Sequence, residues 1–172
     1  MRYLLLSLVM LLTMSGCDDS PPQDISASQI ESSVEEIEKA PVNPIRLHGE
    51  LSDIFTPFSK YTDLQRENTR RKVIGSTVQW NLPVYEVSPP ENGVYRVTTP
   101  SGAFAGENDK NYLMAIIFVT SRDDRDRAVM DSLKTNDVIS FKGVIADIDL
   151  RIAVRVNPAV LFYGKPSSEP HK

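Results

Sequence analysis

The stretch YLMAIIFVTSRDDRDRAVMDSLKTNDVISFKGVIADID, residues 112–149, decides the fold class. It opens on a near-continuous apolar run, 112–120, which is typical of a buried strand. Residues 121–135 begin with a serine-x-x-aspartate pattern and predict a capped helix, and Asn136 can take the left-handed conformation that ends a helix. Apolar residues return over 138–148 and predict another strand. The centre of the fold is therefore a strand, a helix and a strand.

Three further strands are predicted around this unit. Residues 73–87 are rich in β-branched and aromatic residues, with a bulge expected at 81–83 because proline cannot serve a central ladder. A turn at 91–93 leads into a strand over 94–99. In the last strand, 151–162, apolar residues alternate with Arg, Ala and Arg, which predicts one apolar and one basic face. The predicted order is β-β-β-α-β-β.

This order, together with GSTVQW at 75–80, VYEV at 84–87 and DVISFKGVI at 137–145, resembles the tRNA anticodon-like OB domains of bacterial exported proteins. The resemblance covers about residues 61–163, and Asn136 stands where the family usually has glycine. It implies a mainly β fold with a helical leader: a five-stranded Greek-key barrel with the helix between strands 3 and 4. The alternative is another small β-barrel or a half-open α+β sheet.

The leader spans residues 30–72 and predicts three helical segments. The first carries apolar residues at i, i+4 and i+7 and ends at Pro41, and the second is predicted from an Asn-Pro start at 43–44 to about Thr56. A capping box at Thr62 opens the third, which runs to about residue 72. Its basic cluster is either a nucleic-acid patch or a set of solvated cations favoured by the helix dipole, and we prefer the second interpretation. The cluster comprises Arg66, Arg70, Arg71 and Lys72.

The N-terminus predicts export and anchoring. Residues 1–16 have one arginine, an apolar run too short to span a bilayer, and small residues before Cys17, which resembles the lipobox of bacterial lipoproteins. Cys17 is the only cysteine and the predicted lipidation site, although a free thiol after an ordinary signal peptide is the alternative. Asp18 implies retention in the inner membrane, with the outer membrane as alternative. Residues 17–29 predict a flexible tether and 164–172 a disordered tail.

Charge limits the class of partner. The whole chain has 19 Lys+Arg against 23 Asp+Glu, and removal of residues 1–16 takes away Arg2 alone, so the mature net charge is 18 − 23 = −5. An acidic chain is poorly suited to phosphate backbones. We expect a non-enzymatic, periplasm-facing module that binds an envelope protein or a glycan. The alternative is single-stranded nucleic-acid binding in DNA transfer or uptake.

The sequence offers little for catalysis or metal binding, so no cofactor and no metal are predicted. The two histidines, His48 and His171, lie in the leader and in the tail, and no nucleophile, phosphate-loop or zinc motif is present. Asp124 opens a calcium-loop pattern that lacks its glycine and its final glutamate.

Candidate binding residues are therefore surface aromatic and basic side chains on the strands. OB barrels bind on the strand 2–3 face, with aromatics for stacking and cations for charge. Trp80 shares the parity of Val78 and is predicted to lie in the core, as is Phe141. Arg151 and Arg155, four residues apart on one strand face, are the best candidates for binding an acidic partner or ligand. The alternative is that they pair with the chain's own acidic residues. The candidates for ligand or partner binding are Tyr95, Arg96, Tyr112, Arg151 and Arg155.

Overall fold

The computed structural model describes residues 27–56, 59–101, 113–149 and 152–163. The predictions for Cys17, Asp18, the signal peptide, most of the tether and the tail therefore lie outside the described residues. So do two of the candidate binding residues, Tyr112 and Arg151.

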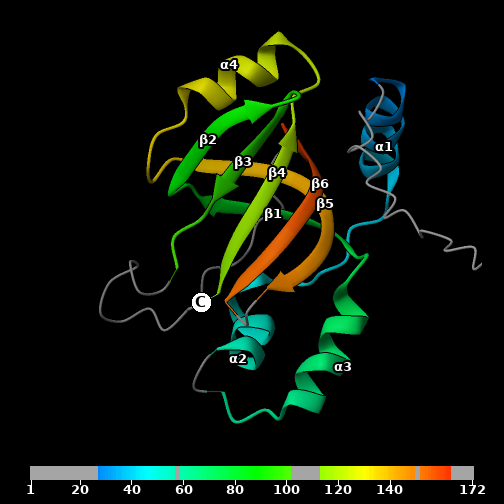
Figure 1. Cartoon of the computed structure of the whole chain (residues 1–172), viewed down its shortest axis with the longest axis vertical. Coiled ribbons are helices and arrows are strands. Elements are labelled where there is room, and N and C mark those ends of the chain that lie inside the picture. The colour runs from blue at the N-terminus through cyan, green and yellow to red at the C-terminus, as the bar shows by residue number, and fades with distance from the viewer. Residues whose placement is uncertain (1–26, 57–58, 102–112, 150–151, 164–172) are drawn as a thin grey trace, which may run out of the picture.

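The chain is mainly β: six strands form one mixed sheet in the order β1-β5-β6-β4-β3-β2 (Figure 1). All neighbouring pairs are antiparallel except β4 and β6, which run parallel. The strands β1 and β2 stand at the two ends of this order, so each has one edge beside which no strand of the described residues lies. The strands are β1 (Thr77–Pro83), β2 (Glu86–Glu91), β3 (Val94–Thr98), β4 (Met114–Thr120), β5 (Val138–Asp149) and β6 (Ala153–Leu161).

The helices lie around the curved sheet. The first, α1 (Ala27–Lys39), contacts β5 and β6, and α3 (Asp63–Val73) contacts β5. Between them a distorted helical turn, η1 (Leu47–Leu51), packs on the short α2 (Ser52–Phe55). The helix α4 (Asp124–Ser132) connects β4 to β5 and lies at the end of the sheet away from α2 and α3 (Figure 1).

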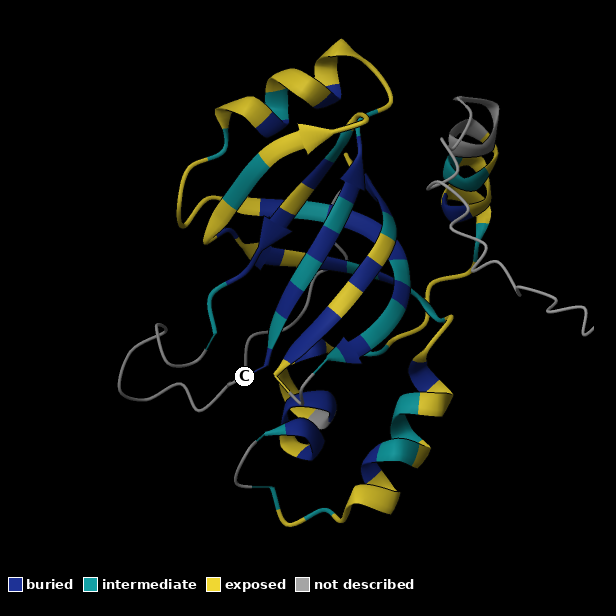
Figure 2. Cartoon of the chain, viewed as in Figure 1, coloured by how far each residue is buried: buried dark blue, intermediate teal, exposed yellow. Residues whose placement is uncertain are grey.

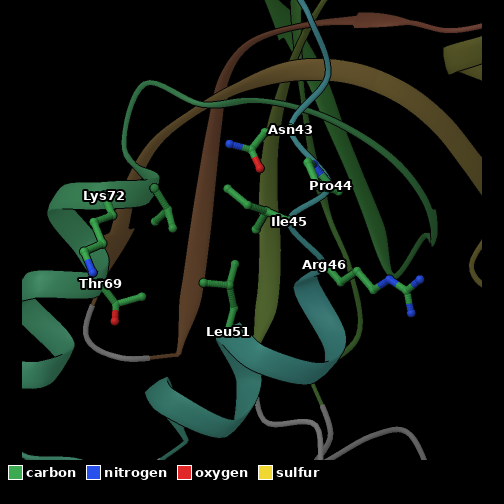
Figure 3. A pocket seen from close by; sticks show the side chains of 8 residues that line it. Asn43, Pro44, Ile45, Arg46, Leu51, Thr69 and Lys72 are labelled. Carbon is green, nitrogen blue, oxygen red and sulfur yellow. The ribbon is translucent and has the colours of Figure 1, made fainter.

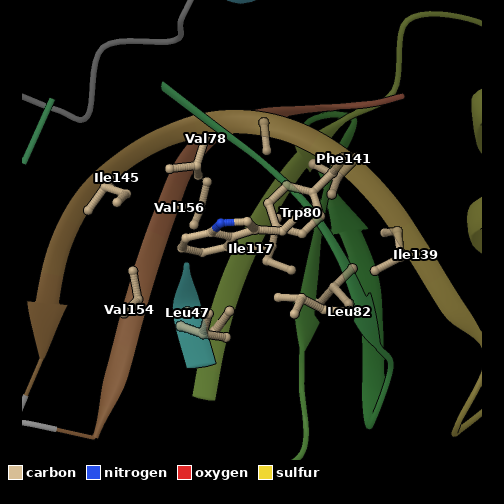
Figure 4. Packing of buried hydrophobic residues seen from close by; sticks show 14 of the residues in the cluster. Leu47, Val78, Trp80, Leu82, Ile117, Ile139, Phe141, Ile145, Val154 and Val156 are labelled. Carbon is tan, nitrogen blue, oxygen red and sulfur yellow. The ribbon is translucent and has the colours of Figure 1, made fainter. Parts of the chain in front are cut away.

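The core lies inside the curve of the sheet and is centred on Trp80 (Figure 4). Its ring meets the ring of Phe141 edge to face, with centroids 6.1 Å apart and planes at 89°. The Trp80 indole N–H donates to the carbonyl of Ile45, 2.8 Å away, which satisfies its one polar atom. Leu47 of η1 is buried against the same cluster, so the leader is part of the core. The sequence prediction of a core Trp80 and Phe141 is confirmed.

Two local signals, the capping box at Thr62 and the left-handed Asn136, are confirmed, whereas the helix predicted over 121–135 is capped by Asp123 instead of Ser121 and ends at Ser132. Thr62 caps α3: its hydroxyl accepts from the Gln65 backbone N–H, and the Gln65 side chain accepts from the Thr62 backbone. Asn136 has φ of +73°, the left-handed conformation expected there. Gly143 lies where β5 and β6 approach closely, and a Cβ added there would stand 2.7 Å from the Cβ of Ala159.

The strand count of five is corrected to six. The segment predicted as one strand with a bulge is two strands, because Pro83 ends β1 and the chain bends before Glu86 opens β2. The helix consequently lies between the fourth and fifth strands in chain order.

Three local predictions are also corrected. The helix expected from residue 43 begins later and is broken, since His48 and Gly49 have non-helical dihedrals and residues 41–46 have no regular secondary structure. The first helix starts at Ala27, inside the predicted tether. In the last strand Ala153 is buried and Ile152, which precedes the strand, is exposed, so the expected apolar and basic alternation fails at its start.

Candidate functional site

An apolar row on the outer side of β4 is the main candidate for a binding surface. Along β4 the inward side chains are fully buried, whereas Met114, Ile116 and Phe118, which alternate with them and so lie on the other face, are only partly covered. Figure 2 shows the alternation of buried and half-buried residues along this strand. A strand that is apolar on both faces usually has both faces covered. Here the outer row is partly open to solvent.

Two arginines lie beside this row. Arg96 of β3 is paired in register with Phe118, and Arg155 of β6 is paired with Ile116. Both arginines are exposed. We call the surface formed by Arg96, Met114, Ile116, Phe118 and Arg155 the outer β4 face. It combines apolar contact area with positive charge on both sides.

The two arginines differ in their surroundings. Arg155 donates to Asp149 at 2.6 Å, which is the pairing with the chain's own acids that the sequence left open. Arg96 makes no ion pair with any described residue. To bind an acidic group of a partner, Arg155 would have to give up its bond to Asp149, whereas Arg96 has no ion pair with a described residue to give up.

Tyr95 does not belong to this face. Its side chain is buried, and its hydroxyl donates to Asp131 of α4 at 2.9 Å. Burial raises the pKa of Tyr95, and the bond to Asp131 raises it further. Successive strand residues point to opposite sides of a sheet, so Tyr95 and Arg96 could not both line one surface. The expectation that Tyr95 contacts a ligand is corrected, and its role is to hold α4 to β3.

The basic cluster of α3 is occupied with contacts inside the protein. Arg66 is buried and donates to the carbonyls of Ile54 and Ser59, so it fastens α2 to α3. Arg70 donates to Asp147 of β5 at 2.6 Å, and this bond raises the pKa of Arg70. The neighbouring Arg71 pairs with Glu67 at 2.9 Å. These pairings leave little free charge for a nucleic-acid backbone on this helix.

Lys72, the last member of the cluster, lies at a cavity of about 390 Å³ between α3 and residues 43–46 (Figure 3). Ile45 and Leu51 form the apolar part of its lining, and Asn43 adds a polar amide. Its size is at the small end of the range of ligand pockets. Arg46 and Thr69 also line the cavity, so its polar part comprises two cationic side chains, a hydroxyl and an amide, which suits an apolar molecule that carries acidic groups.

A polar network that sequence reasoning missed joins α4, β6 and α1. Asp126 is fully buried and accepts from the guanidinium and backbone N–H of Arg122 and from the Tyr163 hydroxyl. Burial alone would raise the pKa of Asp126, but these hydrogen bonds outweigh it and hold the pKa below its ordinary value. Burial and the bond to Asp126 raise the pKa of Tyr163 to about 12.

The same network fixes the end of α1. Arg122 also pairs with Glu38, and the ammonium of Lys142 donates to the carbonyls of Glu38 and Ala40 at 2.8 and 2.7 Å. The partners are 84 to 104 residues apart in the chain, so no local pattern could have indicated them. Their effect is structural: α1 is attached to the sheet at its C-terminal end.

Within the described ranges no three His, Cys, Asp or Glu side chains come together in a way that could hold a metal ion. Among the same residues, no helix has both the length and the apolarity needed to cross a bilayer.

No protein-family profile matches this sequence, and no curated protein matches it. Two solved structures show a distant likeness. The OBody AM3L15 bound to hen egg-white lysozyme is 16% identical with a TM-score of 0.33, over 59% of this chain and 88% of that one. Aspartyl tRNA synthetase from Entamoeba histolytica is 11% identical with a TM-score of 0.35, over 70% of this chain. This chain spans only 24% of the synthetase. Neither likeness carries an argument about function.

Proposed function

We propose that this chain is a lipid-anchored, non-enzymatic binding module that uses the outer β4 face to contact an envelope protein, with a glycan as the second possible ligand. The observation that carries the proposal is the row of Met114, Ile116 and Phe118, partly open to solvent between the arginines of β3 and β6.

An OB-like arrangement supports this choice of surface. The backbone N–H of Val84 donates to the carbonyl of Asp137, next to β5, and the N–H of the next residue, Tyr85, donates to the carbonyl of Thr98 in β3. On this basis we treat β1 and β2 as two halves of one bent strand, which gives five strands with α4 between the third and the fourth. The parallel pair β4 and β6 agrees with that arrangement. In OB folds the face of strands 2 and 3 binds ligands, and these correspond to β3 and β4.

The chemistry of the face favours protein over nucleic acid. Aliphatic side chains give apolar contact area, whereas stacking on bases needs several aromatic rings. The face offers a single ring, that of Phe118, and one of its two arginines is already paired with Asp149. An acidic, apolar protein surface would therefore match it best.

A photoreactive residue in place of Ile116, introduced into the full anchored chain in intact cells, tests this function. We expect a discrete protein adduct after irradiation, and its loss when Arg96→Ala and Phe118→Ala are added. A photoreactive residue in place of Arg71, which is exposed on α3, is the matched control. Equal labelling from both positions, or none from position 116, would contradict the proposal. A single-stranded oligonucleotide that binds with an affinity falling steeply with salt would favour the nucleic-acid alternative.

The anchor is tested separately. Cys17→Ser should leave an uncleaved precursor without lipid, because the thioether to the lipid needs the sulfur. Mass spectrometry of the mature N-terminus measures this, and replacing Asp18 by serine should move the protein to the outer membrane. Unchanged processing of Cys17→Ser would contradict the lipoprotein assignment.

A further inference from the structure

The ladder between β1 and β5 determines which residues of β1 direct their backbone N–H and C=O groups toward β5 and which direct them to the opposite edge. In an antiparallel pair, alternate residues direct their N–H and C=O groups to one neighbour. The Ile145 N–H of β5 donates to the carbonyl of Ser76, and the Val84 N–H donates to Asp137. Even-numbered residues from 76 to 84 therefore face β5.

Odd-numbered residues of β1 face the opposite edge. The carbonyl of Thr77 accepts there from the N–H of Asn43, 2.8 Å away, so one residue of the leader already bonds to this edge. The next two odd positions are Gln79 and Asn81. No described residue forms a hydrogen bond with their backbone N–H or C=O groups on this edge. Gln79 is half-buried and Asn81 is exposed, so solvent reaches the edge.

A cavity of about 170 Å³ lies beside these two residues. Leu47, Trp80 and Leu82 supply the apolar part of its lining. Two basic side chains, Arg46 and His48, are exposed at its rim.

We propose that the Gln79–Asn81 edge of β1 binds an extended segment of a partner protein by strand addition. The backbone N–H and C=O groups of Gln79 and Asn81, which no described residue engages on this edge, have the spacing of another extended backbone, and neither a sugar nor a nucleotide reproduces that spacing. The bond from the Asn43 N–H to the Thr77 carbonyl shows that a backbone donor from another segment can reach this edge.

The side chains around the edge define the partner's sequence pattern. Every second side chain of an added strand points inward, toward the cavity formed by Leu47, Trp80 and Leu82, and an apolar residue fits there. The alternate side chains point outward near Arg46 and His48 and are favoured when acidic. The expected segment therefore alternates apolar and acidic residues. This surface is separate from the outer β4 face, and the inference does not depend on the function proposed for that face.

The probe is a synthetic hexapeptide that alternates leucine with aspartate. Two control peptides have the same composition, one with the three leucines and the three aspartates in blocks, the other alternating but with N-methyl groups on every second amide. Binding is followed by amide hydrogen exchange of the intact protein, measured by NMR. In the free protein the amides of Gln79 and Asn81 should exchange fast, whereas those of Val78 and Trp80 should be protected.

With the alternating peptide, exchange at Gln79 and Asn81 should slow by at least about tenfold, and neither control peptide should have this effect. Gln79→Pro removes one edge donor without touching the β5 ladder and should weaken peptide binding by roughly tenfold. Gln79→Thr keeps the donor and should bind as the wild type does, which separates loss of the N–H from loss of the side chain. Thermal unfolding shows whether each variant is folded.

Several results would overturn the proposal. These are no binding of the alternating peptide at millimolar concentration, binding without protection at Gln79 and Asn81, and equal binding by Gln79→Pro. Protection that arises at high protein concentration without peptide would assign the edge to a second copy of this chain instead of a partner. If only the outer β4 variants weaken peptide binding, the edge is excluded while the function proposed for that face stands.

Discussion

The two end strands of the sheet are built in opposite ways. Pro89 and Pro90 remove two backbone donors from β2, and the register with β3 shifts between Ser88 and Glu91. Proline, charge and irregular register are the usual means by which an edge strand is blocked from further pairing. The strand β1 has regular register throughout and no proline before its last residue.

The inner faces of these strands differ too. Val78, Trp80 and Leu82 of β1 are buried in the core, whereas β2 contributes only the half-buried Val87. The well-anchored strand is thus the one with an open edge, and the weakly anchored strand is the one that is blocked. An edge that serves binding needs a rigid template, so this contrast is what a strand-addition site on β1 requires.

The largest effect should come from the core beneath β1. Phe141→Ala removes a fully buried ring that packs on Trp80 and should lower the free energy of unfolding by about 3–5 kcal/mol. For β1 and β2 themselves, Val78→Ala should cost about 2 kcal/mol because Val78 is fully buried, whereas the same change at the half-buried Val87 should cost about 1 kcal/mol. Denaturant unfolding of all three variants measures the losses. Equal losses for the two valine changes would mean that β1 is no better anchored than β2.

Ion pairs on the two sides of the sheet give the next effect. Asp126 of α4, which pairs with Arg122, is fully buried, while the Asp147–Arg70 pair that joins β5 to α3 is partly exposed. Asp126→Asn should therefore cost about 2 kcal/mol and Asp147→Asn less than about 1 kcal/mol. Thermal or denaturant unfolding at pH 7 compares them. A larger loss for Asp147→Asn would reverse the ranking.

The same network predicts a pH window for stability. The pKa of Asp126 is lowered from 3.8, so its contribution is present above pH 3.8 and is lost as pH falls through the folded value. The pKa of Tyr163 is raised from 10.0 to about 12, so its contribution is present below pH 10 and is lost as pH rises toward 12. Tyr163→Phe should flatten the alkaline limb of a stability–pH curve and leave most of the acid limb. An unchanged alkaline limb would contradict the role of this hydroxyl.

Opening the blocked edge should have a smaller effect on stability. Pro89→Thr with Pro90→Thr restores two N–H groups to β2 and should change the free energy of unfolding by less than about 1 kcal/mol. It should nevertheless cause self-association at high concentration, because an unblocked edge pairs with another. Sedimentation velocity measures it, with the wild type as control. A double variant that remains monomeric would show that the prolines do not block this edge.

Short-range signals were enough to predict many elements of this fold. The Thr62 capping box, the left-handed Asn136 and the burial of Trp80 each depend on residues within a few positions. Pro83 marks an interruption of the ladder, but the sequence alone favours a bulge in one long strand there, whereas β1 ends at that proline. Whether a bend is a bulge or a break depends on which neighbouring strand each half pairs with, and that is a long-range property.

The features that could not be predicted from the sequence depend on contacts between segments that are far apart in the chain. Arg122 and Lys142 both bind Glu38 of α1, which lies more than eighty residues earlier in the chain, and no local pattern indicates either contact. The candidate site shows the same limit: Arg96 and Arg155 were named, but the apolar row between them was assigned wholly to a buried strand. Its partial exposure depends on what covers the sheet. The open edge at Gln79 was not foreseen because unpaired backbone groups leave no trace in side-chain patterns.

The smallest effect on stability is expected on the outer β4 face. Arg155 pairs with Asp149 at the surface, and exposed ion pairs contribute about 0–1 kcal/mol, so Arg155→Ala should unfold within about 0.5 kcal/mol of the wild type. The same change removes positive charge beside Ile116, so it should weaken binding of an acidic partner while leaving strand addition at Gln79 unaffected. Crosslinking from position 116 and peptide binding at the β1 edge, measured on this one variant, separate the two surfaces. If Arg155→Ala weakened both to the same extent, they would form one continuous site, and the contrast between the two edges would no longer account for where partners bind.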